Sequence, residues 1–239
     1  MNAHEEVSRL QKHNCFTVLL FGKTYSNSRD LAVNNGANSK KVCLVDCSKN
    51  PSTQISINPV FNSGQKFDVK AEGVLLTEKG SAAILRTADC PSLVLYNRVS
   101  HKEVITHAGR PALTPKRGEE GKLENIVTYA YEAITNTSKD SDITACITGS
   151  ICGKCFLHDD ENGKKLALPF ITHFGNEIMT KNQGLDLPLV IMNQLSKLGI
   201  DKDKIYHDGL CTYTNDDLHS YRRGKESKED RNTIILILR

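Results

Sequence analysis

The sequence of 239 residues contains no tryptophan, and aromatic residues make up only 6% of it. Single-stranded nucleic acids stack their bases on aromatic side chains, so the chain has few of the groups that such binding requires. Its formal net charge is +3, with 31 basic and 28 acidic residues mixed along the chain. A nucleic-acid-binding protein would concentrate its basic residues in one patch or tail. We therefore expect no nucleic-acid partner.

Long apolar runs are also missing. No apolar run approaches the roughly 20 residues that a transmembrane helix needs. The first twenty residues place acidic and polar groups before the first apolar segment, unlike a signal peptide. Eight cysteines in a chain without such a signal indicate reduced thiols instead of a disulfide framework. The sequence thus predicts a cytoplasmic protein with no membrane partner.

The apolar residues that are present predict both strands and helices. Residues 73–106 contain four short apolar segments separated by turn residues, which favours a meander of strands. Helical spacing predicts helices over 123–134 and 187–198, and Pro169 is expected in the first turn of another helix. The apolar segment 233–238 (TIILIL) is typical of a strand covered on both faces. With no internal repeat or linker, the chain predicts one α/β or α+β domain over all its residues.

Three groups that bind soft metals follow predicted strands. Cys47, Cys90 and His107 each stand where a short apolar segment stops, and the ends of strands are where clefts form. Two thiolates and one imidazole leave a fourth coordination position open, which suits zinc or reduced copper. Spacing alone leaves two alternatives. Cys90 and His107 could form a nucleophile and base pair, or all three could be structural residues of the core.

A second cluster precedes the last strand. Ser220, Arg222 and Arg223, with Arg231 nearby, combine guanidinium and hydroxyl groups that suit a phosphate or carboxylate. The alternative is a solvated charged loop, because acidic and lysine residues are interspersed with the cluster.

One further cysteine motif is weaker. Cys152-x-x-Cys155 has half of the spacing of a zinc knuckle, and no second pair of that kind completes it. We therefore expect no closed metal site there.

Several motifs together resemble the YfiH-type laccase-domain family. They are TADCPSLVLY, THAG, DLPLVIMNQLSKLGI, DGLCTY and SYRR, and their order and spacing hold from about residue 73 to residue 239. Residues 1–40 match the family poorly. The resemblance implies a single-domain α/β (α+β) sandwich with a mixed β-sheet core and helices on the outside. It also implies a metal held by Cys90 and His107, and by Cys47 where the family has a histidine, with zinc expected and copper as the alternative.

The resemblance further implies phosphorolysis of purine nucleosides (adenosine, inosine and methylthioadenosine) and deamination of adenosine. Its partners would be a small-molecule nucleoside and phosphate, and the protein would be a monomer or homodimer. Cys90, His107 and Asp89 would be catalytic, while Ser220, Arg222, Arg223, Arg231 and Cys211 would bind substrate or phosphate. Three alternatives stay open: a copper polyphenol oxidase, a Cys/His hydrolase that edits cell-wall peptide precursors, and an inactive binder. Eight scattered histidines are few for the multicopper oxidase.

Overall fold

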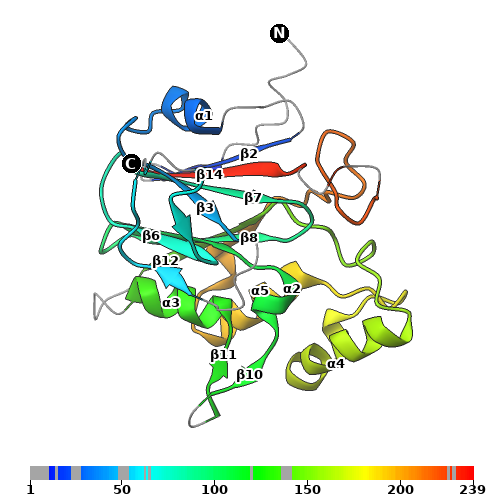
Figure 1. Ribbon diagram of the computed structural model, residues 1–239. Coiled ribbons are helices and arrows are strands. Elements are labelled where there is room, and N and C mark those ends of the chain that lie inside the picture. The colour runs from blue at the N-terminus through cyan, green and yellow to red at the C-terminus, as the bar shows by residue number, and fades with distance from the viewer. Residues whose placement is uncertain are drawn as a thin grey trace.

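The structure is a computed structural model that describes residues 11–13, 16–22, 28–47, 54–61, 63, 66–118, 121–135, 142–224, 227 and 230–239. Two six-stranded β-sheets pack face to face, and helices cover the outer side of each sheet (Figure 1). This arrangement confirms the expected α/β (α+β) sandwich with a mixed β-sheet core and helices on the outside.

The first sheet has the last strand of the chain at its centre. In spatial order it contains β1 (Gln11–His13), β2 (Phe16–Phe21), β14 (Asn232–Leu238), β7 (Ala82–Thr87), β3 (Val42–Asp46) and β5 (Val69–Lys70). β14 pairs antiparallel with both β2 and β7, whereas β3 pairs parallel with β7 and β5. All seven residues of β14 are buried, which confirms the prediction of a strand covered on both faces.

The second sheet contains most of the predicted meander. Its spatial order is β13 (Ile205–His207), β12 (Ile143–Thr148), β8 (Ser92–Asn97), β9 (Lys102–His107), β6 (Gly73–Leu76) and β4 (Ile55–Ser56). The meander prediction was wrong for β7, which belongs to the first sheet. All four segments are apolar on both faces, so their pattern does not distinguish the two sheets. The chain crosses between the sheets over residues 88–91, which places Cys90 at the end of the sandwich.

Helices flank the sheets, and short elements connect them. The described residues include α1 (Ser28–Asn34), α2 (Arg110–Leu113), α3 (Ile126–Thr135), α4 (Glu161–Phe174) and α5 (Leu187–Lys197), the 3₁₀ turns Asn176–Ile178 and Lys202–Lys204, and the hairpin of β10 (Lys116–Arg117) and β11 (Leu123–Glu124). The helix expected over 187–198 is confirmed as α5. The prediction for Pro169 was wrong because the capping side chain of Asp160 starts α4 at Glu161, which leaves Pro169 inside the helix. None of the helices in the described ranges is long and apolar enough to cross a membrane.

The core consists of three apolar layers. Successive side chains of a strand point to opposite faces, so each sheet can pack on both sides. Leu85 and Ile234 of the first sheet pack against the cluster that contains Val94 and Ile105 of the second. The outer face of the second sheet packs on α3 and α5, and that of the first sheet packs on α1. This packing fixes the ends of the central strands, where the candidate site lies.

Candidate functional site

Sheet topology brings the three predicted metal ligands together at one end of the sandwich. Because β3 and β7 are parallel neighbours, Cys47 after β3 and the loop after β7 leave the first sheet at the same end. That loop carries Cys90. In the second sheet Ser92, at the start of β8, pairs with His107 at the end of β9. Residues far apart in sequence therefore meet in one place.

The three residues line one cavity of about 280 Å³. Its wall also contains two arginines and a tyrosine that reach the cavity from β7 and from the segment before β14. The full lining is Cys47, Arg86, Thr87, Ala88, Cys90, His107, Tyr221 and Arg231. The cavity thus combines soft metal ligands with cationic groups that suit an anion.

Glu72, which the sequence analysis did not identify, orients His107. Its carboxylate Oε2 lies 2.7 Å from Nδ1 of His107, and its backbone oxygen accepts a hydrogen bond of 2.7 Å from the His107 N–H. Cys90 also lies near the ring, since a Cβ added at Gly109 would lie 3.0 Å from Cys90 Sγ and 3.0 Å from both Nε2 and Cε1 of His107. Gly109 therefore leaves the room that the thiol and the ring occupy. A carboxylate on the far nitrogen is the usual second partner of a metal-binding histidine.

The electrostatics of the cavity favour a bound cation. Burial opposes the protonation of His107, but Cys90 and Glu72 outweigh it and raise the pKa of His107 to about 10. Burial and the charges of Glu72, Asp46 and Cys90 raise the pKa of the Cys47 thiol well above its usual value. A metal ion would replace these protons. The ligand atoms of Cys47, Glu72 and His107 all lie within 4.8 Å of one another, and Cys90 lines the same cavity. Thiolate, imidazole and carboxylate groups are all ligands that zinc accepts.

The role of Glu72 can be tested by Glu72→Gln. We expect metal affinity to fall by about 10- to 100-fold, because the amide holds the ring of His107 less strongly than the carboxylate does. Competition with a chromophoric chelator measures this. Glu78→Gln is the matched control, since Glu78 pairs with Lys41 on the surface. Equal affinity of Glu72→Gln and wild type would contradict the proposed orientation of His107.

Asp89, which the family resemblance implies to be catalytic, contacts the segment between β13 and β14. Its buried carboxylate accepts hydrogen bonds of 2.6 Å from Thr212 Oγ1 and of 2.6 Å from the backbone N–H of Arg222. It also has a positive φ of 78°, which is uncommon for a residue other than glycine. Asp89 therefore fixes the loop that carries Cys90 to the segment before β14, and its catalytic role stays a prediction.

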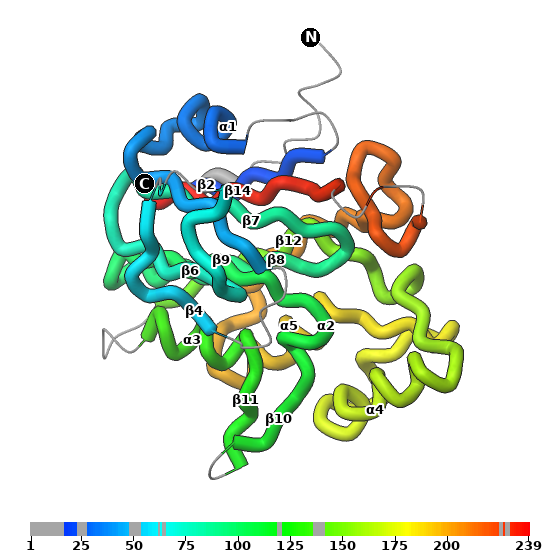
Figure 2. Tube along the Cα trace, in the orientation of Figure 1, coloured from blue at the N-terminus to red at the C-terminus, as the bar shows by residue number. Residues whose placement is uncertain are grey.

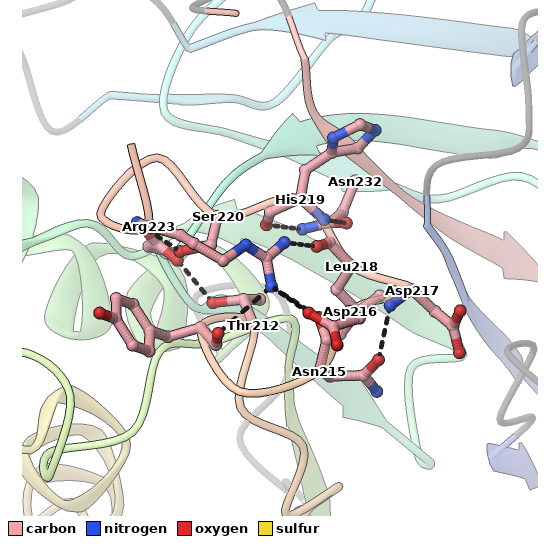
Figure 3. Close-up of polar contacts among 11 residues, drawn as sticks. Thr212, Asn215, Asp216, Asp217, Leu218, His219, Ser220, Arg223 and Asn232 are labelled. Atoms are coloured by element: carbon pink, nitrogen blue, oxygen red, sulfur yellow. Dashed lines mark hydrogen bonds and ion pairs between the residues drawn. The ribbon is translucent and has the colours of Figure 1, made fainter. Parts of the chain in front are cut away.

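Arg223 holds a loop together (Figure 3). Its Nη1 donates hydrogen bonds to the backbone oxygens of Tyr213, at 3.2 Å, and Asn215, at 3.1 Å, and its Nη2 donates to that of Leu218. Ser220 is buried, and its Oγ accepts a hydrogen bond of 3.2 Å from the Arg223 N–H. Those contacts support a structural role for both residues, and phosphate binding by them stays a prediction.

Of the two other predicted arginines, Arg231 lines the cavity. Arg86 lines it as well but was not predicted from the sequence, because an exposed arginine on a strand resembles an ordinary surface residue. Arg222 is not among the described residues that line the cavity, and its guanidinium lies 5.0 Å from the ring centroid of Phe156. Cation–π contact of this kind fixes the side chain in place.

Cys211 lies with two other thiols. Its ligand atom and those of Cys152 and Cys155 are all within 4.8 Å of one another. Burial, together with Cys152 and Cys211, raises the pKa of the Cys155 thiol to about 12. Burial also opposes ionisation of Cys211, but hydrogen bonds from the backbone of Cys152 and Thr214 lower its pKa. The structure thus places a third thiol, that of Cys211, beside the Cys152-x-x-Cys155 pair, for which the sequence offered no second pair.

Comparison with known proteins agrees with the fold and with the motifs. A purine nucleoside phosphorylase of Streptomyces coelicolor is 27% identical over 161 residues, which cover 65% of this chain but only 60% of that protein. Another from Campylobacter jejuni is 27% identical over 172 residues, 71% of this chain and 68% of that protein. The crystal structure of the hypothetical protein YfiH of Bacillus licheniformis matches with a TM-score of 0.73 and 18% identity over 94% of this chain and 93% of that one. The sequence profile described as multi-copper polyphenol oxidoreductase laccase matches residues 23–238. The chain therefore belongs to the multi-copper polyphenol oxidoreductase laccase family, the family that its YfiH-type motifs predicted.

Proposed function

We propose that the protein is a metal-dependent purine nucleoside phosphorylase that acts on adenosine, inosine and methylthioadenosine, and that it also deaminates adenosine. One observation carries this proposal: a single cavity joins the donors of Cys47, Cys90 and His107 to the guanidinium groups of Arg86 and Arg231. The names of the Streptomyces coelicolor and Campylobacter jejuni relatives support the same activity.

The cavity residues have separate tasks in this reaction. Arg86 and Arg231 would hold the charge of phosphate, since guanidinium groups bind its oxygens with paired hydrogen bonds. Tyr221 is 61% exposed at the cavity and offers a ring on which a purine can stack. A bound metal would supply Lewis acidity. Glu72 would keep Nδ1 of His107 engaged, so that Nε2 points into the cavity.

The two proposed reactions break different bonds of the nucleoside. In phosphorolysis a phosphate oxygen forms a bond to C1′ as the bond from C1′ to N9 breaks, and the purine leaves with one proton. In deamination a water oxygen replaces the amino group at C6, and ammonia leaves. Both reactions need an oriented nucleophile beside a positive group, which the cavity provides.

One alternative has a specific observation in its favour. Glu72 contacts Nδ1 of His107, and Cys90 lies near the same ring, so the three residues include the groups of a cysteine hydrolase triad. Such a hydrolase, for example one that edits cell-wall peptide precursors, would use the Cys90 thiolate as its nucleophile. A copper polyphenol oxidase is less well supported, because His107 is the single histidine among the described residues that line the cavity.

A chromatographic assay with adenosine and inosine, with and without phosphate, tests the proposal. We expect phosphate-dependent release of adenine and hypoxanthine, and formation of inosine from adenosine. Chelator treatment should remove both activities, and zinc should restore them. Base release that is independent of phosphate, with no inosine formed, would contradict the proposal. Activity on a peptide substrate that survives the chelator but not iodoacetamide would support the hydrolase instead.

A further inference from the structure

A thiol cluster lies apart from the cavity, on segments that follow two neighbouring strands. Cys152 and Cys155 follow β12, and Cys211 follows β13, which pairs parallel with β12. The two segments therefore leave the second sheet at the same end. Figure 2 shows the segment after β12 and the segment before β14 on the same side of the molecule. Sheet topology thus brings the three thiols together, as it does the cavity ligands.

Backbone hydrogen bonds fix the cluster. The N–H of Cys152 donates to Sγ of Cys211 over 3.3 Å, and the N–H of Cys155 donates to the backbone oxygen of Cys152 over 3.0 Å. The turn is tightly packed, because a Cβ at Gly153 would lie 2.8 Å from Cβ of Asp186. An N–H aimed at sulfur stabilises a thiolate, and hydrogen bonds to charged acceptors are stronger than those between neutral groups.

The spacing of the sulfurs suits a metal ion better than a core role. At the Zn–S bond length of about 2.3 Å, sulfurs around a tetrahedral ion lie about 3.8 Å apart. The sulfurs of the three cysteines are free thiols within 4.8 Å of one another, and each residue is partly exposed to solvent. A small contraction would bring them to bonding distance. Three thiolates without histidine or carboxylate select thiophilic ions such as Zn²⁺ or Cu⁺.

The complex of three thiolates with Zn²⁺ would carry one negative charge. Each of the three cysteines is partly exposed, so solvent can screen that charge.

We propose that Cys152, Cys155 and Cys211 form a second metal site, which binds a thiophilic ion through three thiolates. The site holds together the two segments that support the loop of the cavity. Ile151 N–H donates to the backbone oxygen of Asp89 over 2.9 Å, and Thr212 Oγ1 donates to its carboxylate. An ion at the cluster therefore fixes the residues on both sides of Asp89, next to Cys90.

Metal counting on the reduced full-length protein tests the second site without reference to activity. We expect two equivalents of zinc per chain in wild type and one in the double variant Cys152→Ser/Cys155→Ser. Cys90→Ala, which removes a cavity ligand, should also retain one, and the three substitutions together should retain none. Cys43→Ala is the matched control, because it removes a thiol buried in the core and should retain two equivalents. The proposal would be overturned if the folded double variant still bound two equivalents of zinc. It would also be overturned if wild type bound a single equivalent and Cys90→Ala removed it.

A second measurement covers the case in which the double variant does not fold. In Cys90→Ala protein, zinc should slow the alkylation of Cys152, Cys155 and Cys211 by iodoacetamide at least tenfold, as mass spectrometry of peptides would show. Chelation should restore the fast rate. Alkylation of the three thiols at the same rate with and without zinc would overturn the proposal.

Discussion

Replacing Cys90 by alanine is expected to lower kcat/KM for phosphorolysis by on the order of 10³-fold and to remove the metal of the cavity. Cys90 lines the same cavity as Cys47 and His107, so the substitution removes a proposed ligand from the wall of the site. Steady-state kinetics and metal content measured on one preparation report both effects.

Cys146→Ala provides the control for this substitution. Cys146 is a buried thiol between the two sheets, so the same chemical change there leaves the cavity intact. Metal content also separates the two mechanisms. Loss of activity with loss of one metal equivalent agrees with a ligand role for Cys90, whereas loss of activity with full metal content agrees with a nucleophile. Full activity of Cys90→Ala contradicts both.

The second large effect is expected for Asp89→Ala, which should reduce the free energy of unfolding by about 3–6 kcal/mol. Two donors, Thr212 Oγ1 and the backbone N–H of Arg222, lose a buried charged acceptor, at about 1.5–3 kcal/mol each. Alanine at a φ of 78° adds backbone strain. Urea denaturation measures the loss, and kcat/KM should fall with it because the loop of Cys90 is no longer held.

Two comparator variants separate these causes. Asp89→Asn keeps an acceptor and tolerates the positive φ, so it should be the least destabilising. Asp89→Gly removes the strain but not the loss of the acceptor, so its stability should lie between those of Asp89→Asn and Asp89→Ala. If Asp89→Ala loses less than about 1 kcal/mol, the carboxylate does not anchor this loop.

The positions of the cavity ligands could be predicted from the sequence because each follows an apolar strand. Cys47, Cys90 and His107 mark ends of β3, β7 and β9, and an apolar run that stops is visible without a structure. That these ends meet depends on the parallel pairing of β3 with β7 and the antiparallel pairing of β8 with β9. Pairing partners are set by long-range packing, which a local pattern does not contain.

Residues that act through other residues could not be predicted. Glu72 precedes a short strand and has no distinctive neighbours, yet it contacts His107, 35 positions later. Arg223 belongs to a motif that suits phosphate, but backbone oxygens of the neighbouring loop accept hydrogen bonds from it. Cys211 is 59 positions from Cys152, so no spacing rule for metal knuckles joins them. In each case the contact depends on the fold.

The central place of β14 in the first sheet has a consequence for folding during synthesis. Asn232–Leu238 separates β2 from β7, and these partners precede it by more than a hundred residues of chain. Contacts between distant segments form slowly, and unpaired strand edges invite association with other chains. On the ribosome the facing edges of β2 and β7 therefore stay without their partner until the last strand emerges. Arg231 is translated just before that strand, so the cavity acquires its complete wall only after the segment that precedes β14 has been made.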